Sequence, residues 1–206
     1  WGLVNNAGIS VPTGPNQWLT KDDFAKVLNV NLLGLIEVTL SLLTLVRRGA
    51  GPGGQMRQFF FGGGYCISKF GVEAFSDSLR LEMRNFGVKV SVIEPGYFKT
   101  DMTNRKNLEN DLLSIWKKLP EETKVIYGDS YVKKVSVALS KMEKFCNPSL
   151  RLVTDRIEHA LTSCSPRTRY AVGWDARLLF IPLSYLPSAL TDILFSCLYP
   201  GPARKT

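Results

Sequence analysis

Two short apolar segments that each run into a glycine-containing turn limit what this chain can fold into. Leu3-Val4 leads into Asn5-Asn6-Ala7-Gly8, the pattern of a buried parallel strand followed by a tight turn that faces a ligand. Residues 88–96 alternate like a strand and end in the turn Pro95-Gly96. Helical patterns separate the two segments. A strand, a turn, helices and another strand predict an α/β layer fold.

Helical spacing of apolar residues covers much of the remaining chain. Thr20-Lys21-Asp22-Asp23 supplies an N-cap with acids in the first turn, and the apolar spacing then continues to about Arg48, which predicts a long buried helix. A second helical pattern runs from Tyr65 to Phe86 and stops at Gly87. Further helices are predicted at residues 108–119, 130–146 and 150–164, with a joint at Pro120-Glu121-Glu122 and a short strand at residues 167–173.

The composition is that of one globular domain, with 206 residues of which 45% are hydrophobic and 21% charged. Because the chain starts at Trp1, directly before an apolar strand pattern, we interpret it as the back part of a longer protein. The net charge of +8 comes from basic residues that are scattered and carry no recognition motif, so no nucleic-acid partner is predicted.

Several reactive side chains are interpreted as structural. His159, the only histidine, lies in an apolar helical pattern, and Glu94 and Asp175 are interpreted as solvated or hydrogen-bonded structural acids. No metal site is predicted, because the cysteines are far apart and lack metal-binding spacing. They are interpreted as buried free thiols: Cys66, Cys146, Cys164 and Cys197.

The tail from Leu178 to Tyr199 is the most apolar part of the chain. Pro182, Pro187 and Asp192 interrupt it, so it lacks the roughly 20 uninterrupted apolar residues that a spanning helix needs. The pattern favours either a segment that lies at a membrane surface or a terminal helix that packs into the core.

Tyr65 and Lys69 are the residues whose pattern points most directly to chemistry. Four residues apart on a helix, they lie on one face. A nearby cation favours the phenolate of a tyrosine, so this pair is predicted to accept a proton near neutral pH. Such a base suits the oxidation of an alcohol.

Four motifs in this order and at these separations resemble the back two-thirds of a short-chain dehydrogenase/reductase. They are Asn5-Asn6-Ala7-Gly8, Asn29-Val30-Asn31-Leu32-Leu33-Gly34, Tyr65-Cys66-Ile67-Ser68-Lys69 and Glu94-Pro95-Gly96. Residues 63–80 and 166–176 are similar to the branch that contains retinol dehydrogenases and 17β/3α-hydroxysteroid dehydrogenases. The resemblance covers nearly the whole chain except residues 49–61.

The resemblance implies a fold and an activity. The fold is an incomplete doubly wound, Rossmann-like parallel sheet with helices on both faces and a helical, apolar C-terminal tail. Residues 1–206 form one partial domain: 1–100 are the back part of the cofactor and catalytic core, 101–150 are substrate-side helices, and 178–206 are the apolar segment. The implied activity transfers a hydride between NAD or NADP, with NAD favoured, and a lipophilic alcohol or ketone such as a retinol or steroid.

The resemblance also implies roles for residues. Tyr65 acts as base or acid, Lys69 lowers the tyrosine pKa and bonds the nicotinamide ribose, and Asn31 holds a water in the proton relay. The cofactor would be bordered by backbone and turn residues, namely Asn5, Ala7 and Gly8 on the adenine-ribose side and Pro95, Gly96 and Thr100 near the nicotinamide. From the residues alone, three of these residues have an alternative interpretation: Asn31 as a bridge between strand ends at a helix bend, Gly8 as a turn residue, and Thr100 as a helix cap.

Two departures from the family pattern open an alternative. The glycine-rich turn that binds the pyrophosphate is expected before Trp1, and the window of the catalytic serine holds Gly51-Pro52-Gly53-Gly54. We hypothesise that residues 49–58 come from a frame shift or a wrong splice junction. The alternative function is therefore a catalytically inactive remnant that acts as a membrane-associated or dimer-forming module. The family resemblance and the apolar tail further predict a peripheral or anchored location at the endoplasmic reticulum membrane, and a homodimer is a possible assembly.

Overall fold

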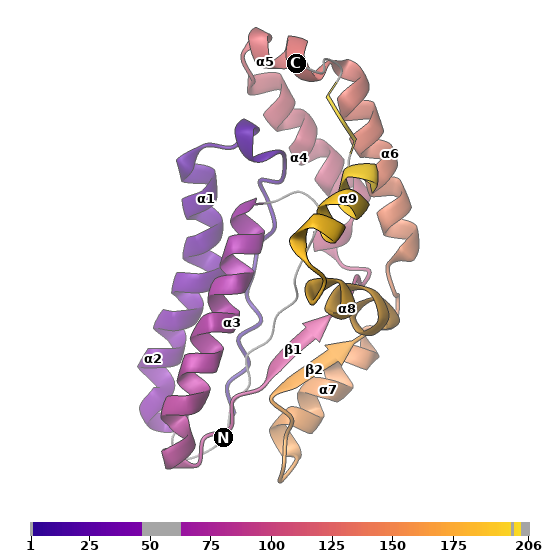
Figure 1. Ribbon diagram of the computed structural model, residues 1–206. Helices are drawn as coiled ribbons and strands as arrows, with labels where there is room; N and C mark the ends of the chain where they lie inside the picture. Colours follow the sequence, from indigo (N-terminus) through magenta and orange to yellow (C-terminus); the bar gives the residue numbers. More distant parts are fainter. Residues whose placement is uncertain (1, 47–62, 199, 203–206) are drawn as a thin grey trace.

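The computed structural model describes residues 2–46, 63–198 and 200–202 (Figure 1). Residues 49–58, whose sequence predicts neither a strand nor the catalytic serine, lie outside the described residues. The hypothesis that these residues come from a frame shift or a wrong splice junction therefore stays a hypothesis.

A small parallel sheet lies at the centre of the described chain. Strand β1 (Val92–Pro95) pairs in parallel with β2 (Arg169–Val172), so that Ile93 lies opposite Tyr170. The α/β class with an incomplete parallel sheet is thus confirmed. Strand β1 is shorter than predicted, because residues 88–91 are largely buried without joining the ladder. Leu3 and Val4 do not lie in a strand, and the next residue, Asn5, forms an isolated β-bridge.

Helices cover both faces of this sheet. On one face, Ile93 and Tyr170 pack with Ala160 of α7 (Arg151–Thr162). On the other face, Arg169 of β2 reaches carboxylates of α3 (Gly63–Met83). Side chains therefore alternate between the two faces along each strand, as the pleat of a sheet requires.

The first long helical segment begins and bends as its residues dictate. Thr20 and Asp23 form the predicted capping box at the start of α1 (Lys21–Leu28). A π-helical segment, Asn29–Leu33, then leads into α2 (Gly34–Val46). The prediction that this helix is buried is wrong: Leu33 is 53% exposed and Leu40 is 55% exposed. By length and composition alone, residues 21–43 could also cross a membrane, which is weak support for a membrane role.

Small residues let α3 approach the first helices closely. Gly64, Ser68, Val72 and Ser76 recur every four residues and are all buried. A Cβ at Gly71 would lie 2.7 Å from Leu32 Cδ2, so no larger residue fits there without displacing that side chain. The helix gives way to a short 3-10 turn, Arg84–Phe86, and the chain turns at Gly87, whose φ is 73°. The predicted stop at Gly87 is confirmed.

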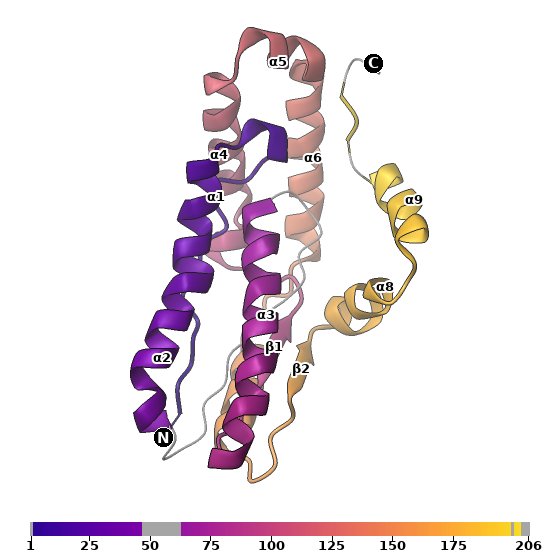
Figure 2. The ribbon, with the colours of Figure 1, turned by 60° about the vertical axis from the view of Figure 1, so that its left-hand side comes forward.

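Three helices form an arm that extends beyond the sheet (Figure 2). They are α4 (Arg105–Lys118), α5 (Glu121–Tyr127) and α6 (Asp129–Phe145). The sequence predicted α4 and α6 but treated α5 as part of a joint. Trp18 fills the space between the arm and the N-terminal loop, where its ring lies 5.2 Å from that of Trp116 and 5.5 Å from that of Tyr131.

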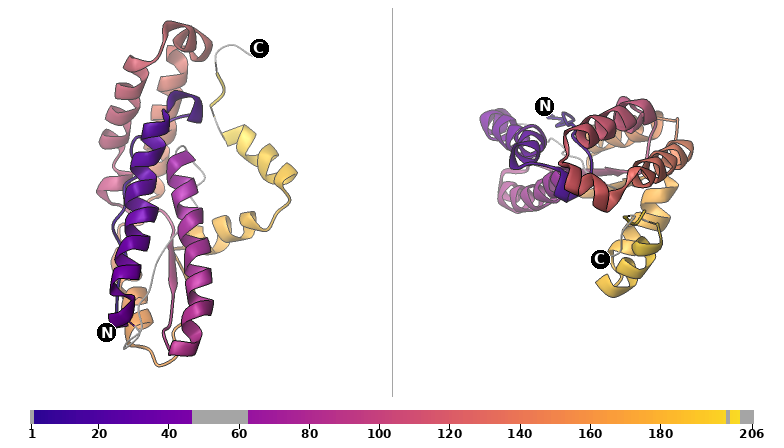
Figure 3. Two further views of the ribbon diagram at one scale, coloured as in Figure 1. Left: turned by 90° about the vertical axis from the view of Figure 1, so that its left-hand side faces the viewer. Right: turned by 90° about the horizontal axis from the view of Figure 1, so that it is seen from above.

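Beyond Phe180, the apolar tail projects from the body instead of packing into it (Figure 3). It consists of a π-helical turn, Ala176–Phe180, followed by α8 (Ile181–Ser184) and α9 (Ser188–Leu198). Tyr185 is 84% exposed, and most described side chains of α9 are exposed. Of the two alternatives for this tail, a terminal helix packed into the core is therefore wrong for α9, although Phe180 at the start of the tail is buried against Tyr97 and Cys146.

Two neighbouring leucines of α4 test where the core of the arm lies. Leu112 is 3% exposed and belongs to the cluster around Trp18, whereas Leu113 is 42% exposed. We expect Leu112→Ala to lower the free energy of unfolding by about 2–5 kcal/mol, because it removes buried methyl groups and leaves a cavity. Leu113→Ala should change it by less than about 0.5 kcal/mol. Urea unfolding followed by circular dichroism measures both, and equal losses would contradict this packing.

Candidate active site

Tyr65 and Lys69 occupy the first two turns of α3. Their spacing of four residues brings the Lys69 Nζ atom to 5.0 Å from the centroid of the Tyr65 ring. A cation at this distance over the face of an aromatic ring is attracted by the ring quadrupole. The expected juxtaposition of phenol and ammonium on one helix face is therefore present.

The turn after Leu3-Val4 meets α3 at Lys69. A Cβ placed on Gly8 would lie 3.7 Å from Lys69 Nζ and 3.4 Å from Asn31 Oδ1. Gly8 thus brings the backbone of the turn to van der Waals distance from the ammonium and from Asn31. Nearby, the Asn5 side chain donates a hydrogen bond of 2.9 Å to Thr39 of α2. The turn is consequently held between the two helices.

Asn31 lies beneath the turn and ties it to α3. Its Oδ1 accepts a hydrogen bond of 2.8 Å from Ile9 N, and its Nδ2 donates to Ile9 O at 2.9 Å and to Ser68 Oγ at 3.0 Å. Ser68 in turn donates to the carbonyl oxygen of Tyr65 at 2.7 Å. Because the side chain is 1% exposed, both amide protons are used inside the protein. This geometry matches the bridging interpretation, and the role of Asn31 in a proton relay stays a prediction.

A cleft of about 580 Å³ opens above these residues, at the carboxyl end of β1. Among the residues expected to act on substrate or cofactor, Asn31 alone does not line it. The others all do, namely Asn5, Ala7, Gly8, Tyr65, Lys69, Pro95, Gly96 and Thr100. In open α/β sheets, ligands bind at the carboxyl ends of the strands, so the position of this cleft is that of a ligand site.

The cleft also has an apolar wall that the sequence did not identify. It is built from Phe98, Met102, Leu150, Val153 and Ile157. Val153 and Ile157 are four residues apart, a spacing that places them on one face of α7 but does not reveal which neighbour that face meets. The cleft therefore joins a polar floor to an apolar side.

Burial changes the acid–base properties of the pair in the direction opposite to the prediction. Desolvation, reinforced by Cys66, raises the pKa of Tyr65 to about 12, and desolvation lowers the pKa of Lys69 to about 8. The prediction that the cation makes Tyr65 a base near neutral pH is thus wrong for the chain alone. Loss of water around the phenolate outweighs the attraction of an ammonium that is itself poorly hydrated.

The donor set of the cleft fits the ribose end of a dinucleotide cofactor. Lys69 forms no ion pair or hydrogen bond among the described residues, although it is half-buried. A buried ammonium needs hydroxyl or anionic partners, and the hydroxyls of a ribose provide them. The close approach of backbone at Gly8 leaves room for such a group beside the ammonium.

The second turn of the cleft is stabilised from both sides. Gly96 N donates to Val172 O at 2.7 Å, so the turn after β1 is tied to the end of β2. Thr100 forms a capping box with Thr103 at the start of a 3-10 helix, Asp101–Thr103. Thr100 therefore caps a helix, as one interpretation predicted, and also lines the cleft.

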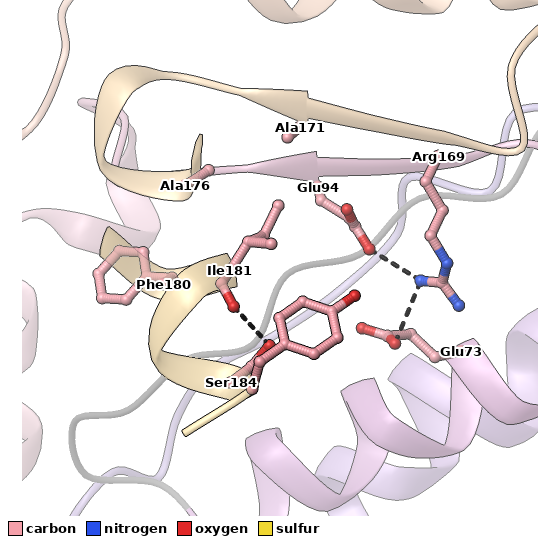
Figure 4. A pocket seen from close by; sticks show the side chains of 9 residues that line it. Glu73, Glu94, Arg169, Ala171, Ala176, Phe180, Ile181 and Ser184 are labelled. Carbon is pink, nitrogen blue, oxygen red and sulfur yellow. Dashed lines mark hydrogen bonds and ion pairs between the residues drawn. The ribbon is translucent and has the colours of Figure 1, made fainter. Parts of the chain in front are cut away.

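Arg169 links the sheet to α3 in a second, smaller cavity of about 370 Å³ (Figure 4). Its guanidinium bonds Glu94 at 2.8 Å, Glu73 at 3.2 Å and Asp77 at 2.9 Å. A fork of donors suits several carboxylates at once. Glu94 is thus a hydrogen-bonded structural acid, as predicted.

The remaining reactive residues lie away from the cleft. His159 Nδ1 is 2.9 Å from the Tyr170 hydroxyl, which supports its structural interpretation. Cys146 is buried, whereas Cys66 is half-buried and Cys164 is exposed, so the prediction of buried thiols is correct only for Cys146. The side chain of Cys197 lies outside the described residues.

A parallel sheet whose strand ends open into a cleft with a tyrosine and a lysine one helical turn apart defines an α/β protein with a ligand site at the carboxyl ends of its strands. The model of the short chain dehydrogenase family matches residues 1–111, which is more than half of the chain. The chain therefore belongs to the short-chain dehydrogenase family. This family uses NAD or NADP.

Two curated relatives show which members of the family the chain is similar to. It is 54% identical to retinol dehydrogenase 7 of Rattus norvegicus and 49% identical to 17-beta-hydroxysteroid dehydrogenase type 6 of Homo sapiens, in each case over 209 residues and 99% of this chain. It spans 66% of the length of retinol dehydrogenase 7, just under two thirds. A short-chain dehydrogenase from Burkholderia cenocepacia, solved in complex with NADP, shares the fold with a TM-score of 0.65 and 16% identity over 94% of this chain and 68% of its own.

A substitution at Asn31 tests its bridging role. Asn31→Asp keeps the shape but loses the amide protons that bond Ile9 O and Ser68 Oγ, and it places a carboxylate against a carbonyl oxygen. We expect a loss of about 2–5 kcal/mol in the free energy of unfolding. The exposed neighbour Asn29 supplies the control, since Asn29→Asp makes the same change in water. Denaturant unfolding compares them, and equal stability of the two variants would refute the bridge.

The lowered pKa of Lys69 predicts a pH dependence of stability. Between pH 8 and 10.5 the unfolded chain binds more protons at this lysine than the folded chain, so stability rises with pH across that window. From pH 8 to 10 this contribution is about 2 kcal/mol, and above pH 10 the raised pKa of Tyr65 acts in the opposite direction. Lys69→Met should abolish the rise. Thermal or urea unfolding of both proteins at each pH measures the difference, and parallel curves would show that Lys69 is not desolvated.

Proposed function

We propose that this chain is an NAD(P)-dependent oxidoreductase that interconverts a lipophilic alcohol and its ketone or aldehyde. The observation that carries the proposal is the position of Tyr65 and Lys69 on the floor of a cleft whose rim consists of the turns at Asn5–Gly8 and Pro95–Thr100. The names of its relatives, a retinol dehydrogenase and a hydroxysteroid dehydrogenase, support this substrate class.

Tyr65 is the group that exchanges a proton with the substrate oxygen. In ketone reduction its hydroxyl donates the proton as the carbonyl carbon receives a hydride, and in alcohol oxidation it accepts the hydroxyl proton as the hydride leaves the carbinol carbon. The nicotinamide ring, when bound, supplies or takes up that hydride. With a pKa of about 12, Tyr65 is protonated at neutral pH in the chain alone, which suits the donor role.

Lys69 binds the ribose of the cofactor and orients it beside Tyr65. Near pH 7 it is still mostly an ammonium, because its pKa is about 8. Its position between the Tyr65 ring and Gly8 allows it to hold ribose hydroxyls beside the tyrosine. These hydroxyls would replace part of the water that the Lys69 ammonium loses on burial. Asn31 maintains this arrangement from below through Ile9 and Ser68.

The apolar parts of the surface suit a lipophilic substrate and a membrane location. The wall formed by Phe98, Met102 and Val153 would contact the hydrocarbon part of a retinol or steroid. We further propose NAD as the preferred cofactor and the endoplasmic reticulum membrane as the location, with Tyr185, Leu186 and the exposed apolar side chains of α9 at the lipid surface. The homodimer stays a prediction.

The test is direct binding and turnover with the whole chain. Nicotinamide fluorescence and calorimetry should show saturable binding of NAD or NADP, and retinol or a hydroxysteroid should then be turned over. Tyr65→Phe should retain cofactor binding but lower kcat by about 10²- to 10⁴-fold, because the proton donor is gone. Tyr185→Phe removes the hydroxyl of an exposed tyrosine that does not line the cleft, and it should leave kcat unchanged. No binding at millimolar cofactor would leave only the inactive, membrane-associated or dimer-forming alternative.

A further inference from the structure

Asp175 is a buried acid that lies directly behind the cleft. It follows β2 in the segment Gly173-Trp174-Asp175 and is 7% exposed. Its Oδ2 atom accepts a hydrogen bond of 2.6 Å from the backbone N–H of Tyr97, a residue of the cleft wall. The predicted structural acid is therefore attached to the turn that forms one border of the cleft.

The carboxylate of Asp175 occupies the space that side chains at Gly96 and Gly173 would need, so both positions require glycine. A Cβ on Gly96 would overlap the carboxylate group of Asp175, and one on Gly173 would lie 2.6 Å from its Oδ1. Gly173 also has a φ of 98°, which side chains with a Cβ rarely adopt. The turn after β1, the turn after β2 and the carboxylate thus form one interlocked unit.

This unit sets the position of the cleft wall. Gly96 N bonds Val172 O, and the next amide, Tyr97 N, bonds Asp175. Consecutive amides of one turn are thereby held by the end of β2 and by the acid that follows it. Pro95, Gly96 and Tyr97 all line the cleft, so a displacement of Asp175 would move its wall.

The charge of Asp175 is also available to the cleft. Among the described residues, no lysine, arginine or histidine forms an ion pair with it. A buried charge is screened far less than one in water. The two redox forms of a nicotinamide differ in charge, since the oxidised ring is a cation and the reduced ring is neutral. A carboxylate behind the wall attracts only the cation.

We propose that Asp175 is a positioning residue of the cleft whose negative charge favours the oxidised over the reduced form of the cofactor. The inference rests on the proposed function, because it requires a nicotinamide beside the Pro95–Tyr97 turn. It adds a cause for redox preference that lies outside the tyrosine and lysine pair. Asp175 itself does not touch the reacting atoms.

The experiment measures dissociation constants of the whole chain for NAD⁺, NADH, NADP⁺ and NADPH by calorimetry or nicotinamide fluorescence. Asp175→Asn retains an oxygen that accepts from Tyr97 N but removes the charge. We expect it to weaken binding of the oxidised form relative to the reduced form by about threefold to tenfold, while binding of the reduced form is retained. Asp175→Ala also removes the acceptor and should weaken both forms.

Controls separate this inference from the proposed function and from misfolding. Asp129→Asn removes an exposed carboxylate of α6 and should leave the affinity ratio unchanged. An unchanged ratio in Asp175→Asn, in a protein that binds both forms, would overturn the charge effect. Full retention of both affinities in Asp175→Ala would overturn the positioning role. Failure of the unsubstituted chain to bind any form would instead refute the proposed function, and near-ultraviolet circular dichroism verifies that each variant is folded.

Discussion

The arrangement of the cleft depends on the hydrogen bonds of one buried amide, that of Asn31. A side-chain amide has one acceptor group and two donor protons, and here they join the Ile9 backbone to Ser68 of α3. Tyr65 and Lys69 belong to that helix, and the turn at Asn5–Gly8 directly precedes Ile9. These bonds fix the distance between a loop and a helix that are distant in sequence. The small residues of α3 allow the close approach that the bonds require.

Local features of the fold were predictable, whereas features that depend on distant partners were not. The capping box of Thr20 and Asp23 and the stop at Gly87 need only neighbouring residues. The partners of Asn31 lie 22 and 37 residues away, so its motif identified the residue but not its contacts. The pKa of Tyr65 could not be predicted either, because spacing reveals the nearby cation but not the burial that outweighs it.

Helix α3 connects the two cavities of the molecule. Its first turns carry the tyrosine and lysine of the cleft, and its middle carries Glu73 and Asp77, which bond Arg169 of β2. Arg169 begins β2, and Val172 at its other end leads to Asp175, so one end of this strand is tied to α3 and the other supports the cleft wall. The sheet is small, yet side chains from α3 and the segment after β2 stabilise both of its strands.

The desolvation of Lys69 also has a consequence for reactivity. At a pH equal to its pKa, half of the side chains are free amines, whereas a lysine with an ordinary pKa of about 10.4 is almost entirely protonated near pH 8. Only the free amine is a nucleophile. A small acylating reagent that enters the cleft therefore meets a lysine far more reactive than those on the surface, and any molecule that occupies the cleft shields it. The burial that lowers the pKa of Lys69 therefore also makes the rate of its acylation a measure of whether the cleft is occupied.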